Sequence, residues 1–245
     1  MGSPEMQDGS PRPGGARYDG WAEWYDQYIR GRRLYSDLPA HIGRLVGRGD
    51  GICIDVGCGT GVYLNTIASL GGSVIGVDLS VDQLRLAVRR WSSVVQADAA
   101  QLPFPPNHAA RVVSVLTHTD IDDLESFLRE AGRVIVPGGQ LVLLATHPCF
   151  VGPFARMEGG PDGNTIIHPG YWNRERVFEG PGIGDGIRAR VGARHVPMAD
   201  LLNGILASGL QIDAVEELGD GAVPWLLALV ASKPKLASAT STRYP

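Results

Sequence analysis

Three glycines at alternate positions, Gly57, Gly59 and Gly61, follow an apolar segment over residues 52–56 and carry the clearest chemical signal in this chain. A glycine lacks Cβ, so it permits positive φ angles and lets a ligand approach the backbone closely. Seventeen residues past Gly61, a second apolar segment ends in Asp78. If both segments are strands of one parallel sheet, the glycine loop can wrap a nucleoside while the carboxylate accepts hydrogen bonds from the ribose diol.

The glycine spacing departs from the dinucleotide-binding pattern G-x-G-x-x-G, because the third glycine comes one residue early. The run Asp55-Val-Gly57-Cys-Gly59-Thr-Gly61 instead resembles motif I of the class I S-adenosylmethionine (SAM) methyltransferases. Four further segments resemble later motifs of that family and come in the family's order. They are Val74-Ile-Gly-Val-Asp78-Leu-Ser80, residues 97–105, Ser114-Val-Leu116-Thr-His118 and Val136-Pro-Gly138-Gly139. The resemblance covers roughly residues 18 to 232, and five motifs in order indicate the family better than any one of them.

The resemblance implies SAM as the cofactor and S-adenosylhomocysteine as its product. Asp78 would accept both ribose hydroxyls, Asp98 would meet the adenine amino group, and Ala99 would donate a backbone N–H to the ring. Helix capping is the alternative role for Asp78 and is a stronger rival for Asp98. Asp55 is expected to organise the glycine loop or to meet the methionine ammonium. The expected cofactor-binding residues are Tyr18, Tyr25, Asp55, Gly57, Gly59, Gly61, Asp78, Leu79, Asp98, Ala99 and Leu116.

Tyr18 and Tyr25 belong to a Tyr-Asp-x-x-Ala/Trp-x-x-Tyr-Asp pattern that precedes motif I in many small-molecule members of the family. One of the two tyrosines is expected to close over SAM. Plain packing of an amphipathic helix is the alternative.

The other periodic segments predict the elements that position these residues. Helices are expected over residues 18–33, around 124–131 and over 199–208. Ser36 is expected to cap another helix, which carries Leu38, Ile42, Leu45 and Val46 on one face. A capping box from Ser80 to Gln83 predicts a further helix that runs to Arg90. Further strands are expected at 94–97, 112–116, 141–146, 211–218 and 225–232. Because strands and helices alternate, the fold class is α/β with a doubly wound, mostly parallel sheet. The resemblance implies that this sheet is Rossmann-like and seven-stranded, with an antiparallel pair at its end. The last two strands share only a short turn and should therefore be antiparallel.

A segment over residues 148–197 has no clear periodicity but is rich in glycine, proline, aromatic residues and arginine. Because it follows the fifth strand, it should lie over the carboxyl ends of the sheet, where ligands bind. We interpret it as a substrate cap inserted in a single domain spanning residues 18–235; an unstructured surface excursion is the alternative. The expected substrate-binding residues are Phe150, Tyr171, Trp172, His168 and His195.

Two histidines are candidate catalytic bases. His118 follows the fourth strand and His147 follows the fifth, so both should point into the crevice and either imidazole could take a proton from a hydroxyl. A hydrogen-bonded structural histidine is an equal alternative for each, and His41 and His108 are interpreted as structural or solvent-facing. Cys149 could be the nucleophile of an RNA cytosine carbon-methyltransferase, but a small apolar role is favoured because a basic RNA-binding surface is lacking.

Composition narrows the function further. The formal net charge is −4, which disfavours a general nucleic-acid or anionic-membrane surface. The only lysines are Lys233 and Lys235, which excludes an internal Walker or Schiff-base lysine. Three cysteines without metal spacing, no signal peptide and no apolar run long enough for a bilayer predict a cytoplasmic protein with no metal site. Residues 1–17 and 236–245 are expected to be disordered tails.

The sequence therefore predicts a SAM-dependent methyltransferase whose partner is a small-molecule substrate, a bulky aromatic or peptide-like secondary metabolite. Oxygen is slightly preferred over nitrogen, carbon or sulfur as the acceptor atom because of the histidines. Two other classes stay open: a protein that binds SAM without methyl transfer, such as a cyclase or a regulatory subunit, and a dinucleotide-dependent oxidoreductase, against which the early third glycine counts. The oligomeric state is not predicted.

Overall fold

A computed structural model describes residues 16–30, 35–158 and 163–235, so the expected tails lie outside the described residues except for Ala16 and Arg17. The central sheet comprises β1 (Ile52–Val56), β2 (Ser73–Asp78), β3 (Val94–Gln96), β4 (Ala109–Val115), β5 (Ile135–Thr146), β10 (Gln211–Leu218) and β11 (Leu226–Ser232). The helices are α1 (Ala22–Arg30), α2 (Leu38–Val46), α3 (Leu64–Ala68), α4 (Val81–Ala87), α5 (Leu124–Val134), α6 (Arg188–Val191) and α7 (Met198–Ala207).

In the described residues the strand order of the main sheet is β10-β11-β5-β4-β1-β2-β3. The pairs β3–β2, β2–β1, β1–β4 and β4–β5 are parallel, whereas β11 is antiparallel to both β5 and β10. This confirms the predicted α/β class, the doubly wound sheet and the antiparallel final pair. The strand order reverses at β1, which lies between β2 and β4, so the crevice at its carboxyl end is the expected ligand-binding place of such a sheet.

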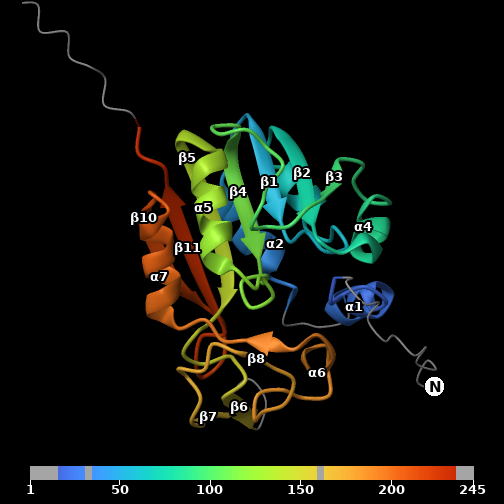
Figure 1. The fold of residues 1–245 in the computed structure, drawn as a ribbon, viewed down its shortest axis with the longest axis vertical. Helices are drawn as coiled ribbons and strands as arrows, with labels where there is room; N and C mark the ends of the chain where they lie inside the picture. Colours follow the sequence, from blue (N-terminus) through green and yellow to red (C-terminus); the bar gives the residue numbers. More distant parts are fainter. Residues whose placement is uncertain (1–15, 31–34, 159–162, 236–245) are drawn as a thin grey trace, which may run out of the picture.

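Each face of the sheet buries an apolar layer of its own. Phe127 and Leu128 of α5 and Leu201 of α7 pack on one face with inward residues of β4, β5 and β11. On the other face, Ile42 of α2 and Ile67 of α3 pack with alternate residues of the same strands. Figure 1 shows α5 and α7 in front of the sheet and α2 behind it. The alternation of inward residues along each strand fixes which side chains reach the carboxyl edge.

Three local expectations need correction. Ser36 does not cap α2: Asp37 occupies the N-cap position, and the Ser36 hydroxyl donates to the Asp37 carboxylate instead. Ser80 does cap α4 by accepting from the Gln83 N–H, but that helix ends at Ala87. The strand expected at 141–146 begins earlier, at Ile135, because β4 already begins at Ala109 and pairs there with Ile135.

The cap over residues 148–197 consists of small elements below the carboxyl ends of the central strands (Figure 1). They are the antiparallel pair β6 (Ala155–Glu158) and β7 (Asn164–Ile167), the pair β8 (Arg176–Val177) and β9 (Ala193–Arg194), and α6. A substrate-binding role for this segment stays a prediction. Its irregular sequence reflects turns and strands of only two or four residues, which are too short to show a clear period.

Candidate cofactor site

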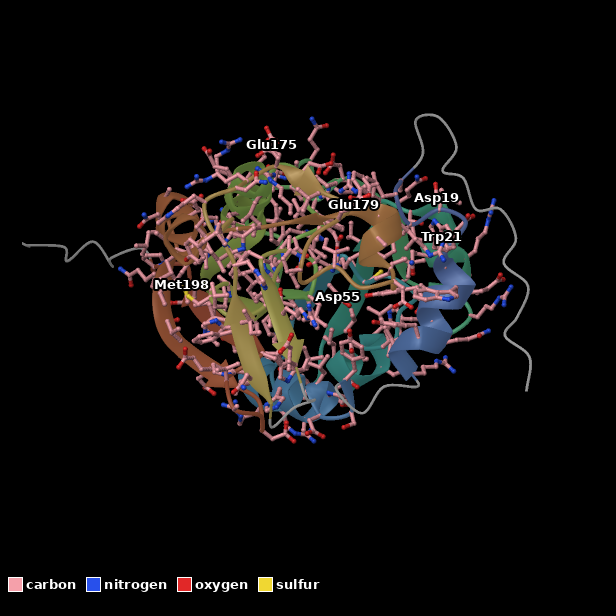
Figure 2. The ribbon with its side chains drawn as sticks, turned by 90° about the horizontal axis from the view of Figure 1, so that it is seen from below. Asp19, Trp21, Asp55, Glu175, Glu179 and Met198 are labelled. Carbon is pink, nitrogen blue, oxygen red and sulfur yellow. The ribbon has the colours of Figure 1, made fainter. Side chains whose placement is uncertain are left out.

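A cavity of about 410 Å³ lies at the carboxyl ends of β1, β2 and β4. Its walls include nine of the eleven residues expected to bind the cofactor, namely Tyr18, Tyr25, Gly57, Gly59, Asp78, Leu79, Asp98, Ala99 and Leu116. The other two, Asp55 and Gly61, are buried behind it. Figure 2, seen from the cap side, shows Asp55 near the middle of the molecule. A hypothetical Cβ on Gly61 would lie 3.2 Å from Ala87 of α4, so this glycine serves helix packing.

The glycine loop and Asp78 form one hydrogen-bonded unit. The Gly59 N–H donates to Oδ2 of Asp78 at 2.8 Å, and the Ser80 N–H donates to Oδ1 at 2.9 Å. Gly57 has φ +75°, and a Cβ there would lie 2.1 Å from Cγ2 of Thr117. The loop after β4 therefore packs directly on this glycine. The Asp78 carboxylate is held rigidly at the cavity wall, as an acceptor for ligand hydroxyls must be.

Burial places two acids close to their titration range at neutral pH. Burial and the nearby Asp78 charge raise the pKa of Asp55 to about 7. Burial raises the pKa of Asp78 to about 6, against the lowering effect of the Ser80 and Gly59 hydrogen bonds. A ligand that brings positive charge, such as a sulfonium or an ammonium, would favour the ionised form of both acids.

Leu116, directly after β4, has φ +60°, which is rare for a residue with a side chain. Such a conformation costs of order 1–3 kcal/mol and clusters at functional sites. The Leu116 N–H is nonetheless fixed by a 2.7 Å hydrogen bond to the Leu144 carbonyl of β5. The strained turn directs residues 117–123 across the mouth of the cavity, where five of them line its wall.

The N-terminal segment covers the cavity from the side of α1. The Tyr18 and Tyr25 rings meet edge to face with centroids 5.2 Å apart, and both line the cavity. The segment is tied to the cofactor edge by Asp19, which accepts from the Ser80 hydroxyl at 2.6 Å, and by Asp26, which accepts from the Thr60 hydroxyl at 2.6 Å. These contacts hold both tyrosines at the cavity wall, and closure of one of them over SAM stays a prediction.

The two candidate bases are not at the cavity. The His147 ring is buried; its Nε2 lies 2.9 Å from Oε1 of Glu217 on β10, and its Nδ1 accepts from the Cys149 N–H. His118 is also buried, and burial lowers its pKa to about 3. Neither ring is part of the cavity wall, so the described structure does not bring the two candidate bases to this cavity. A strand-end position fixes the edge of the sheet but not the direction of the side chain.

The expected substrate walls pack mainly within the cap. The Tyr171 ring contacts Phe154 and His195, and its hydroxyl accepts from the Met198 N–H at 3.0 Å. Phe150 packs on the His147 ring, and His168 is half-buried. Trp172 is 69% exposed. None of the five predicted substrate residues lines the cavity. Tyr171 and His195 instead pack with Phe154 inside the cap.

His195 lines a second cavity of about 480 Å³ between the cap, α5 and α7. Burial lowers its pKa to about 4, so the imidazole is neutral at physiological pH. Asp122 and Asp123 form walls of both cavities. The loop after β4 thus separates the cofactor cavity from a space bordered by the cap.

The arginines of the cap form ion pairs, a hydrogen bond or a ring contact with other residues of the same chain. Arg156 pairs with Glu158, Arg174 with Asp200, Arg176 with Asp122 and Arg188 with Asp120. Arg194 donates to the Asp122 carbonyl, and the Arg190 guanidinium lies 4.3 Å from the Trp21 ring centroid. The cap therefore does not offer these arginines as ready anion sites.

Sequence reasoning missed Thr117, Asp120 and Ile121, which also line the cavity. The acidic run Asp120, Asp122 and Asp123 was a usable signal, since it follows a strand predicted to end at the ligand edge. Cys149 is half-buried and lies outside the cavity wall. Within the described ranges, no group of three or more His, Cys, Asp or Glu side chains is arranged to hold a metal ion. Among the helices of those ranges, none is long and apolar enough to cross a lipid bilayer.

Comparisons with known proteins agree with this geometry. Residues 54–143 match the family described as "Methyltransferase domain". A demethylmenaquinone methyltransferase of Thermobifida fusca is 30% identical over 169 residues, covering 62% of this chain and 69% of that protein. One of Tropheryma whipplei is 34% identical over 110 residues, covering 42% of this chain but only 46% of that protein. The chain thus spans about half the length of some of the curated relatives that it matches.

Among solved structures, a SAM-dependent methyltransferase from Mesorhizobium loti superposes with a TM-score of 0.66 at 22% identity, covering 84% of this chain and all of that one. At this identity the likeness shows the fold. Together with the sequence relatives, it places the chain: it belongs to the class I SAM-dependent methyltransferases, whose cofactor is SAM.

Proposed function

We propose that this chain transfers the methyl group of SAM to a small-molecule acceptor. The observation that carries the proposal is the Asp78 carboxylate, which Gly59 and Ser80 hold at the wall of the cavity where the strand order reverses. A ribose diol can donate to that carboxylate while the nucleoside follows the glycine loop. Asp98, Ala99 and Leu79 form the adjoining wall, as an adenine site requires.

The reaction itself needs little chemistry from the protein. The acceptor lone pair attacks the methyl carbon in line with the breaking C–S bond, and the sulfonium becomes the neutral thioether of S-adenosylhomocysteine. Positioning of this kind supplies about 7 to 11 kcal/mol, more than a general base usually adds. The tyrosine lid and the loop over residues 117–123 would hold the acceptor and exclude water.

For the acceptor we propose a bulky aromatic or peptide-like metabolite that approaches from the cap. The names of the sequence relatives, demethylmenaquinone methyltransferases, support an aromatic acceptor. A preference for oxygen rested on His118 and His147, and neither lines the cavity. The described geometry therefore favours no acceptor atom among oxygen, nitrogen, carbon and sulfur.

The test begins with the purified protein. Denaturation followed by mass spectrometry should release SAM or S-adenosylhomocysteine from it, and calorimetry should show that added S-adenosylhomocysteine binds. Incubation with methyl-labelled SAM and a panel of aromatic phenols, amines, thiols and quinols should then label one class. Asp78→Asn should lose the labelling. Asp50→Asn, which changes an exposed carboxylate at the opposite end of β1, should retain it.

Two results would contradict the proposal. Release of NAD would place the chain among dinucleotide-binding proteins. Tight binding of S-adenosylhomocysteine without methyl transfer to any acceptor of the panel or of a cell extract would favour a protein that binds SAM for another purpose.

A further inference from the structure

Two acidic residues after β4, Asp120 and Asp122, form ion pairs with arginines of the N-terminal segment and of the cap. Oδ2 of Asp122 accepts from Arg17 of the N-terminal segment at 2.6 Å, and Oδ1 accepts from Arg176 of the cap at 2.9 Å. Asp120 pairs with Arg188 on α6 of the cap. Both acidic residues also line the cavity. The lid, the cap and the ligand-binding wall therefore meet on one short loop.

Asp120 is the more enclosed of the two acids and uses both of its oxygens. Oδ1 accepts from the Arg188 guanidinium, and Oδ2 accepts from the Tyr18 hydroxyl at 3.2 Å. The Asp120 side chain is 18% exposed, whereas that of Asp122 is 66% exposed. An ion pair shielded from water holds its geometry more firmly than one in solvent.

The surroundings of Arg188 and Tyr18 keep both groups protonated. Burial by itself would lower the pKa of Arg188, but Asp120 and Tyr18 outweigh that effect and raise it. Burial also raises the pKa of Tyr18, so its hydroxyl remains a donor. Arg188 lies two residues before Arg190, which stacks on Trp21, and both views show α6 beside the α1 segment (Figures 1 and 2).

We propose that Asp120 is a positioning residue that transmits occupation of the cofactor cavity to the cap. A ligand in the cavity lies against Tyr18, Thr117, Asp120 and Ile121, which line its wall. Those contacts fix Asp120, and Asp120 fixes Arg188 and α6. The cap is then firmly ordered only when the cofactor is bound, so the acceptor meets a complete site only after SAM has entered. The inference rests on the cavity being the cofactor site but does not require that methyl transfer occurs.

Hydrogen–deuterium exchange of peptides covering α6, measured with and without S-adenosylhomocysteine, tests this coupling. In the wild-type protein, saturation with S-adenosylhomocysteine should slow exchange in α6 by about tenfold. Asp120→Asn and Arg188→Gln should abolish that slowing. Arg188→Gln should still bind S-adenosylhomocysteine within about threefold of the wild-type affinity, because Arg188 does not line the cavity.

The matched control is Arg156→Gln. It breaks another cap ion pair, with Glu158, inside the β6–β7 hairpin, and should keep the full slowing. If Asp120 were only a structural support, α6 would exchange faster in Asp120→Asn but would still be slowed about tenfold by S-adenosylhomocysteine. That outcome, or a wild-type protein whose α6 does not respond to bound S-adenosylhomocysteine, would overturn the proposal.

A second variant keeps the test decisive if Asp120→Asn does not fold. Tyr18→Phe retains the ring packing on Tyr25 and removes only the hydroxyl that donates to Asp120. It should reduce the slowing of α6 at saturating S-adenosylhomocysteine. Unchanged slowing in both Tyr18→Phe and Arg188→Gln would show that the cap senses the cofactor by another route. A protein that binds S-adenosylhomocysteine and couples to α6, but methylates nothing, would refute the proposed function alone.

Discussion

The Asp55 carboxyl group at the end of β1 is buried within the electrostatic influence of Asp78 at the end of the neighbouring β2. Its pKa is raised to about 7 from a usual value of 3.8, first by burial and then by the Asp78 charge. Asp55 is thus protonated in the folded protein over a pH range in which it is ionised in the unfolded chain. The free energy of unfolding must therefore depend on pH through this residue.

We expect Asp55→Asn to become more stable, relative to the wild type, as the pH rises from about 4 to 7. Below pH 3.8 both states of the wild type are protonated and the two proteins should differ little. Between the two pKa values Asp55 loses its proton in the unfolded state but keeps it in the folded state, so the free energy of unfolding of the wild type falls as the pH rises. The total loss reaches roughly 4 kcal/mol above pH 7. Urea unfolding at pH 4, 5.5 and 7.5 measures the difference. A difference independent of pH would show that Asp55 titrates normally.

Asp78→Ala should weaken the binding of S-adenosylhomocysteine by roughly 10- to 100-fold, about 1.5 to 3 kcal/mol, because charge-assisted hydrogen bonds to the ribose are lost. The change also frees the N–H groups of Gly59 and Ser80, so circular dichroism and thermal unfolding must accompany the titration calorimetry. Asp50→Asn is the control at the far end of β1. Unchanged affinity in a folded Asp78→Ala protein would remove this carboxylate from the site.

His147→Gln and His118→Gln should each keep turnover within a few-fold of the wild type, because neither imidazole lines the cavity. A true general base would cost about 10² to 10⁴ in turnover, and the loss would shrink towards the pKa of the acceptor. Turnover measured from pH 6 to 9 distinguishes the two cases. A large, pH-dependent loss in either variant would mean that the ring turns into the cavity when the acceptor binds.

Tyr171 and Trp172 are neighbours with different surroundings, so their single substitutions should differ. Tyr171→Ala removes a ring packed on Phe154 and His195 and an acceptor for the Met198 N–H, and should lower the thermal midpoint by several degrees. Trp172→Ala should leave stability nearly unchanged, because that ring is mostly exposed. Differential scanning fluorimetry decides the stability effects. If Trp172→Ala raised the Michaelis constant for the acceptor while SAM affinity held, the original interpretation of Trp172 as a substrate wall would regain support.

Much of the cofactor site was predictable from the sequence. The alternate glycines and Asp78 each follow a predicted strand, and adjacent parallel strands bring their carboxyl ends to one edge. The positive φ angles at Gly57 and Gly59 are local properties that the residue type permits. The N-cap role of Ser80 after Asp78 is likewise local, because it depends on the residue type and its place before a helix. The antiparallel final strands likewise followed from a turn too short for a crossover.

The acceptor side was decided only by tertiary structure. His147 lies at the carboxyl end of a parallel strand as Asp78 does, yet its Nε2 lies 2.9 Å from Oε1 of Glu217 on β10, 70 residues later in the chain. Tyr171 was predicted to contact the substrate, but its ring packs on Phe154 and His195 inside the cap. Arg176 and Arg188 of the arginine-rich cap pair with Asp122 and Asp120 of the loop after β4. A side chain turns toward the partner that satisfies its polar groups and fills its space, and that partner can come from any part of the chain. Sequence spacing thus determined the edge of the sheet at which the cavity lies, whereas long-range packing and charge pairing decided which side chains line it.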